Sequence, residues 1–246
     1  MKSWLDDRVI KTLKDLETSN ITLVEWEHPL LTRLGYPLVP KSDLIFLVPD
    51  EQLEKANDIT ASSGLQLVGD DDTPPTYLSE HAGRGFRYVY GDPKQRFILV
   101  PLSWTGIEKD ELQIVPAEDG GLECTVWTAP LPSVCAAYLR IIVGETKSSR
   151  ARHIAMADLA GVIGYSMFDM SYEGAYLALP EDDYDENGEN TCDREAAAAK
   201  EAMALEKALE EVRGWRFSKD DAWTRDTLIQ LISGQISYHQ LPCKET

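Results

Sequence analysis

Three side chains, Glu27, His28 and Asp43, are of types that can move protons. Histidine titrates near neutral pH, and a neighbouring carboxylate can orient its ring, so the three could act as a general acid/base set. A second interpretation is open, in which His28 merely starts a helix and Asp43 caps or turns the chain before a strand. We take the three residues as the catalytic candidates.

Three further polar side chains are candidates for contact with a substrate. His81, Arg84 and Arg87 precede and enter a predicted strand. Guanidinium groups bind carboxylates and phosphates, so Arg84 and Arg87 could hold an anionic substrate. In a chain this acidic, pairing with the protein's own carboxylates is the commoner role for such arginines.

Several familiar motifs fail in this sequence. Gly83-Arg84-Gly85 begins like a dinucleotide fingerprint, but Tyr88 stands where the third glycine belongs and a strand follows instead of a helix. The stretch 164–168 misses the nucleophile elbow because its fifth residue is Phe168. The four cysteines are scattered without a CxxC pair, so we expect reduced thiols and no metal centre.

The charge balance bears on partners and on compartment. The 246 residues include 42 acidic and 24 basic side chains, for a net charge of −18. Such an excess repels phosphate backbones and anionic membrane surfaces, so we expect neither nucleic acid nor membrane as a partner. With no secretory signal and no apolar run of membrane length, the sequence predicts a cytoplasmic protein. It predicts no oligomeric state.

Hydrophobic patterning predicts a mixed first half and a helical second half. An amphipathic helix is expected before Asn20, and another over residues 50–63. The continuous apolarity of residues 44–48 is typical of a strand buried on both faces. Strands are expected over 21–26, 44–48, 65–68, 84–90, 96–104, 111–115 and 122–127.

The second half predicts helices over 131–143, 151–170 and 194–213, and a last one after Ser218. The segment 181–193 between them holds seven acidic residues and no basic one; its spacing does not match an EF-hand, so we expect a solvated connection rather than a calcium site. The expected fold is α/β followed by α, a small mixed sheet flanked by helices with a helical C-terminal half. The expected domains are 1–128 and 129–246.

One stretch of sequence resembles a known superfamily. A strand is followed by a short helix ending in Gly35-Tyr36-Pro37, then by KSDLIFLVPDE at 41–51, a helix and Gly64-Leu65. This arrangement resembles the nucleotidyltransferase fold, in particular fungal nucleotidyltransferase-like proteins whose strand reads roughly D-h-x-F-V-V-P-D-E. In active members of that superfamily, two carboxylates two residues apart lie on one face of this strand and chelate Mg²⁺ with a nucleotide.

The sequence departs from that pattern at the positions that would bind metal. Asp43 matches the first carboxylate, but Ile45 stands at the second position. Glu27-His28 replaces the usual pair of small residues, and the expected third strand carries no acid within 96–102. The resemblance implies a pocket between the sheet and the helical half, near Glu27, His28 and Asp43.

Two functional hypotheses follow. The first is a divergent nucleotidyltransferase-fold protein that acts on a small molecule in this cleft, within specialised metabolism, with no cofactor and without standard two-metal transfer. Magnesium with a nucleotide is the alternative cofactor. The second hypothesis is a non-catalytic binding or regulatory protein that kept the fold and lost the metal site. Whether the protein is an enzyme is left open.

Overall fold

The computed structural model describes residues 5–36, 43–69, 84–91, 94–117, 122, 124–168, 191–217 and 222–245, and for 191–198 and 222 only the backbone. The chain forms two compact units. The first comprises residues 1–158 together with 242–246, and the second comprises residues 159–241. The boundary lies within one helix, so each unit is described by itself.

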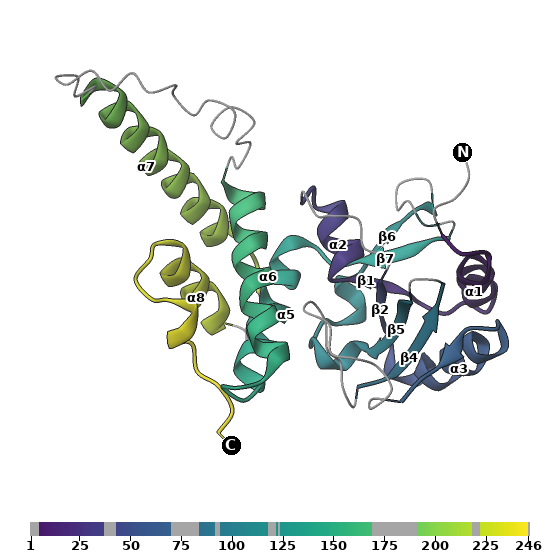
Figure 1. The fold of residues 1–246 in the computed structure, drawn as a ribbon. Helices are drawn as coiled ribbons and strands as arrows, with labels where there is room; N and C mark the ends of the chain where they lie inside the picture. The colour runs from purple at the N-terminus through teal and green to yellow at the C-terminus, as the bar shows by residue number, and fades with distance from the viewer. Residues whose placement is uncertain are drawn as a thin grey trace. The chain divides into compact units, whose positions relative to one another are not determined.

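A seven-stranded mixed sheet is the centre of the first unit (Figure 1). Its order is β3-β4-β5-β2-β1-β7-β6, with β2 parallel to β5, β1 parallel to β7, and the other neighbours antiparallel. The strands are β1 (Val24–Trp26), β2 (Leu44–Val48), β3 (Gln66–Leu67), β4 (Phe86–Tyr90), β5 (Gln95–Pro101), β6 (Gln113–Val115) and β7 (Val126–Thr128).

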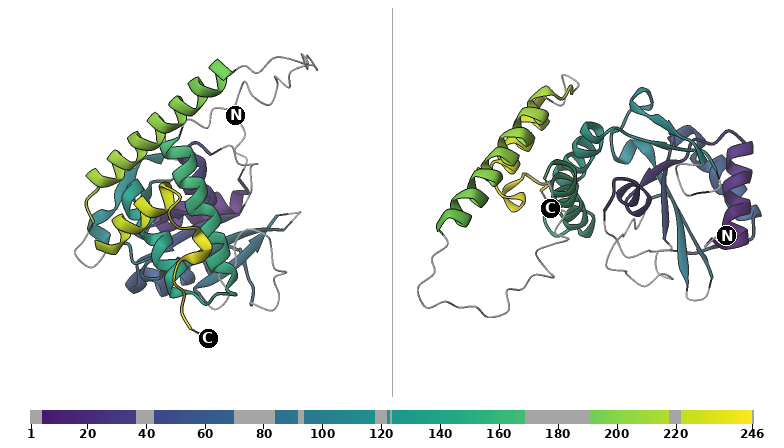
Figure 2. Two further views of the ribbon diagram at one scale, coloured as in Figure 1. Left: turned by 90° about the vertical axis from the view of Figure 1, so that its left-hand side faces the viewer. Right: turned by 90° about the horizontal axis from the view of Figure 1, so that it is seen from above.

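Helices α1 (Asp7–Thr18) and α3 (Asp50–Ser62) cover one face of this sheet (Figures 1 and 2). Asp6 caps α1 by accepting the backbone N–H of Arg8 at 2.9 Å. The α1 side chains that repeat every three or four residues pack on alternate side chains of the central strands, which form the main core. Its members include Val9, Leu13, Leu16, Phe46, Tyr88, Phe97 and Leu99.

The opposite face of the sheet is covered by helix α5 (Leu131–Gly144), with the start of α6 (Arg150–Met167) beside it. Trp26 and Ile45 pair across β1 and β2, so their side chains share this face. Tyr138 of α5 packs on Trp26 with ring centroids 4.8 Å apart. The short helix α2 (His28–Arg33) follows β1 directly.

Short 3-10 helices and the C-terminal tail complete the first unit. The 3-10 helices span Leu102–Trp104 and Lys109–Glu111. Lys244 donates its backbone N–H to the carbonyl of Glu145 at 3.0 Å, just past the end of α5. Arg152 is buried and donates to the carbonyls of Ile142 and Pro242, so one side chain joins the end of α5 to the tail.

The second unit is helical where it is described. Helix α7 (Thr191–Gly214) packs on α8 (Ala222–Ile232), and a 3-10 helix follows at Tyr238–Gln240. Arg225 ties the two helices together by donating to the carbonyl of Trp215 at 2.7 Å. Ala208, Val212, Leu228 and Leu231 are buried in this unit.

The α/β-then-α class expected from the sequence is confirmed, including a mixed sheet. Strand β1 begins at Val24 instead of residue 21 and ends at residue 26 as expected, whereas β5 ends at Pro101, where a 3-10 helix replaces the rest of the predicted strand. The 128/129 domain boundary stays a prediction; the change from strands to helices falls there, whereas the compact units divide after residue 158. Residues 181–190 of the acidic segment lie outside the described residues.

Candidate functional site

Asp43 lies at the start of β2, where its carboxylate is held by Arg96 of the neighbouring strand. The backbone N–H of Arg96 donates to Oδ1 of Asp43 at 2.9 Å, and its Nε and Nη2 donate to Oδ2 at 3.0 and 2.6 Å. The two residues are adjacent in the parallel register, because Leu44 pairs with Phe97. Asp43 therefore fixes the alignment of β2 on β5.

The residues at the positions of the superfamily's metal pair do not fit Mg²⁺ and a nucleotide. The carboxylate of Asp43 already accepts three N–H groups from Arg96. Ile45, at the second position, is 1% exposed and offers no oxygen. Mg²⁺ demands several hard oxygen ligands in octahedral geometry, and an arginine beside the first carboxylate opposes a cation there.

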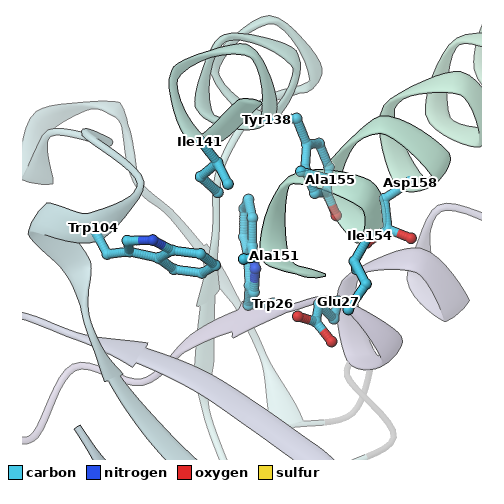
Figure 3. Close-up of a pocket in the computed structure, with 9 residues that line it drawn as sticks. All are labelled: Trp26, Glu27, Trp104, Tyr138, Ile141, Ala151, Ile154, Ala155 and Asp158. Carbon is cyan, nitrogen blue, oxygen red and sulfur yellow. The ribbon is translucent and has the colours of Figure 1, made fainter. Parts of the chain in front are cut away.

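A pocket lies on the α5 face of the sheet, within the first unit (Figure 3). The space in it that is open to the centre of a water-sized group is about 10 Å³, enough for one such group. Most of its wall is apolar, and its polar groups come from the end of β1, from α5 and from α6. The lining residues are Trp26, Glu27, Trp104, Tyr138, Ile141, Ala151, Ile154, Ala155 and Asp158.

Glu27 enters the pocket from a backbone conformation that favours glycine. Its φ of 50° and ψ of −117° lie where a Cβ atom crowds the backbone. The carbonyl of Glu27 accepts the N–H of Leu31 at 2.8 Å, so this residue forms the turn from β1 into α2. Only 7% of the residue is accessible to solvent. Strain of this kind in a non-glycine residue is concentrated at functional sites.

Tyr138 brings a buried hydroxyl to the same pocket. The residue is 1% exposed, and among the described residues its hydroxyl oxygen has no hydrogen-bond partner of ordinary geometry. Figure 3 shows the hydroxyl end directed toward Asp158. Burial, and then the negative charges of Asp158 and Glu27, raise the pKa of Tyr138 well above its usual range. The phenol therefore keeps its proton throughout the physiological range.

Two tryptophans form the aromatic side of the pocket. The rings of Trp26 and Trp104 meet edge to face, with centroids 6.4 Å apart and planes at 76°. Outside the pocket, the guanidinium of Arg84 stacks on Trp104 with its Cζ 5.2 Å from the ring centroid, and forms an ion pair with Glu145. Arg84 thus supports the wall through Trp104.

The structure separates the sequence-predicted site residues. Glu27 lines the pocket, and Arg84 reaches it only through Trp104. His28 begins α2 beside Glu27 and is half-buried, but it is not among the lining residues. Arg87 is buried on β4, also away from the lining. His81 lies outside the described residues, and the roles assigned to all six, including Asp43, stay predictions.

Sequence reasoning missed Tyr138 and Asp158. Both stand in segments that the pattern identifies as buried helix. One signal was present: Asp158 is the only acidic residue of α6, within the otherwise apolar run IAMADLAGVIG. A lone carboxylate at a position surrounded by core-type side chains indicates a specific polar environment.

Comparisons with known proteins give a distant structural likeness. No protein-family model and no curated protein matches the chain. Among solved structures, the chain is similar to the antibiotic-resistance factor ANT(2'')-Ia, an aminoglycoside nucleotidyltransferase whose conformational dynamics are regulated by its substrate. The two are 16% identical over 70% of this chain and 93% of that chain, with a TM-score of 0.38. A score of this size supports no residue-level comparison.

Among the helices that the structure describes, none combines the length and apolarity needed to cross a membrane.

Proposed function

We propose that the chain binds a small molecule at the pocket formed by Glu27, Tyr138 and Asp158, and that Glu27 is its acid/base group. The observation that carries this proposal is the buried Tyr138 hydroxyl, which is directed toward Asp158 without a hydrogen bond of ordinary geometry, in a pocket lined by two carboxylates. A buried polar group without a good hydrogen bond costs up to about 1–3 kcal/mol, and a ligand that completes the bond recovers part of this free energy.

The strained turn at Glu27 supports the same proposal. A glycine would adopt φ 50° without strain, whereas glutamate there costs on the order of 1–3 kcal/mol. A residue that destabilises its own turn and places a carboxylate at a pocket is a candidate for ligand binding or catalysis rather than for stabilising the fold. A carboxylate in an apolar wall can accept or return a proton to a bound molecule.

In this proposal the chemistry proceeds without the superfamily's metal pair, because Arg96 holds Asp43 and Ile45 offers no ligand. The engaged Asp43 also favours a second candidate function, a binding or regulatory protein that kept the fold and does no catalysis. A role in specialised metabolism, a fungal source and a cytoplasmic location are proposals that rest on the resemblance and the charge of the sequence alone.

A ligand screen tests the proposal. The full chain is screened by thermal shift against amino acids, organic acids, sugars, polyamines and the four nucleoside triphosphates with and without Mg²⁺. We expect a stabilising small molecule whose effect is lost in Glu27→Gln and Asp158→Asn. The exposed Glu54→Gln on α3 removes one carboxylate outside the pocket and serves as the matched control.

Two results would contradict the proposal. One is a complete screen in which no compound stabilises the protein. The other is a stabilising compound whose effect persists unchanged in both pocket variants. Turnover of the identified compound then separates the two candidate functions, since only the first requires it.

A further inference from the structure

We propose that this pocket receives the protonated amino group of a primary amine, an inference that rests on the proposed function. Glu27, Asp158 and Tyr138, each of which carries side-chain oxygen, are among the residues that line it. An ammonium group carries three N–H donors and no acceptor. Three oxygen-bearing side chains around one small space match that donor pattern.

The charges at the pocket favour a cation over an anion or a neutral group. Its lining includes two carboxylates and no basic side chain. The guanidinium of Arg84, which stacks on the lining residue Trp104, is paired with Glu145. Because burial and the two carboxylates keep the Tyr138 phenol protonated, its oxygen is an uncharged acceptor.

The aromatic wall suits the same group. A cation over an indole face is attracted by the ring quadrupole, by about 0.5–2 kcal/mol according to its desolvation. Trp104 already receives one cation, Arg84, on its ring. The ring of Trp26 lies between those of Trp104 and Tyr138, so the pocket presents aromatic surface on one side and carboxylates on the other (Figure 3).

The size of the pocket restricts the kind of amine. A volume of about 10 Å³ admits one water-sized group, which is the size of a primary ammonium head. The body of the ligand must therefore lie outside this space, with its amino group inserted.

Three phenyl compounds of similar size test the inference. Benzylammonium, benzyl alcohol and benzoate carry a positive, a neutral and a negative polar group on the same ring. The ¹⁵N-labelled full chain is titrated with each, and the indole N–H signals of its six tryptophans are followed, with Trp26 and Trp104 assigned by Trp→Phe variants. We expect benzylammonium to shift these two signals saturably, and the other two compounds to leave them unchanged.

Variants then assign the contacts. We expect Glu27→Gln and Asp158→Asn each to weaken benzylammonium about tenfold, because a charge-assisted hydrogen bond is lost. Tyr138→Phe keeps the ring and is expected to weaken binding less. Glu54→Gln is the control that leaves binding unchanged, and the dispersion of the spectrum reports whether each variant is folded.

The outcomes separate this inference from the proposed function. If benzyl alcohol or benzoate shifts Trp26 and Trp104 as strongly as benzylammonium does, the pocket binds ligands but not through an ammonium group, and only this inference fails. If none of the three moves these signals, the inference is wrong and the thermal-shift screen decides the proposed function. Equal affinity in wild type and Glu27→Gln also overturns the inference.

Discussion

Glu27 directly follows β1 and Asp43 directly precedes β2, so the two residues stand at neighbouring strand ends. Their carboxylates are held in different ways. Asp43 accepts three N–H groups of Arg96 and aligns two parallel strands. Glu27 stands in a strained turn with its side chain at a pocket. At this scale the sequence predicts both as acid/base candidates; the contacts show Asp43 aligning two strands, and our proposal gives ligand contact to Glu27.

The Asp43 contacts make a stability prediction. Asp43→Asn keeps the shape of the side chain but removes the charge that Arg96 pairs with. We expect the free energy of unfolding to fall by about 1–3 kcal/mol. Urea unfolding of the variant beside Glu54→Gln measures this difference, and an Asp43→Asn protein as stable as wild type would contradict the structural role.

Two substitutions at Glu27 test for strain in its turn, and each is the control for the other. Glu27→Gly and Glu27→Ala both remove the carboxylate, but only glycine adopts φ 50° without a Cβ clash. We expect the glycine variant to be more stable than the alanine variant by about 1 kcal/mol. Thermal or urea unfolding of the pair checks this order, and a more stable alanine variant would exclude strain at this turn.

A positive φ also explains a glycine in the stretch that resembles a dinucleotide-binding motif. The Gly83-Arg84-Gly85 stretch resembles a dinucleotide fingerprint, yet Gly85 has φ 70° and a Cβ there would meet the carbonyl oxygen of Leu99 at 1.9 Å. The glycine at 85 therefore serves the close approach of β4 to β5.

At the scale of elements, one arginine joins three of them. Arg33 of α2 forms an ion pair with Glu25 of β1 and donates to the hydroxyl of Thr128 in β7. Glu25 is 3% exposed, and burial raises its pKa above the ordinary value of 4.5 against the opposing effects of Thr128 and Arg33. Thus α2, which starts at the pocket, is anchored to the sheet by a buried carboxylate.

That anchor predicts a pH dependence. Because the folded state holds the Glu25 proton more tightly than the unfolded chain, its contribution to stability falls as pH rises from 4.5 through the raised folded-state pKa, and is constant above it. Glu25→Gln lacks this titration. Urea unfolding at several pH values should show wild type losing stability relative to Glu25→Gln across that window, and a relative gain would contradict the assignment.

How far the elements follow from the sequence depends on how local their causes are. The five apolar residues of β2 predict its bounds correctly, since a strand buried on both faces needs no alternation. The end of β5 and the pocket could not be predicted from the sequence. Trp104 continues the apolar pattern of the strand, and only its tertiary contacts with Trp26 and Arg84 show that it belongs to the pocket wall. Tyr138 and Asp158 meet Glu27 across more than a hundred residues of chain, which no local spacing records.

At the scale of the whole molecule, the net charge of −18 governs encounter with other molecules. Its long-range field opposes polyanions and favours cations, in agreement with the ligand class inferred for the pocket. We expect no tight binding of duplex DNA or transfer RNA at about 0.15 M salt. Fluorescence polarisation with labelled nucleic acids measures this, and binding that weakens steeply with added salt would show a local basic surface.

The measurement that tests the account most directly is calorimetric titration with ATP, CTP, GTP and UTP, with and without Mg²⁺, on wild type, Asp43→Asn and Glu27→Gln. We assign ligand contact to the pocket at Glu27, and strand alignment to Asp43. We therefore predict no Mg²⁺-dependent nucleotide binding in wild type. Mg²⁺-dependent binding that is lost in Asp43→Asn and kept in Glu27→Gln would contradict this assignment and return the functional centre to the strand end.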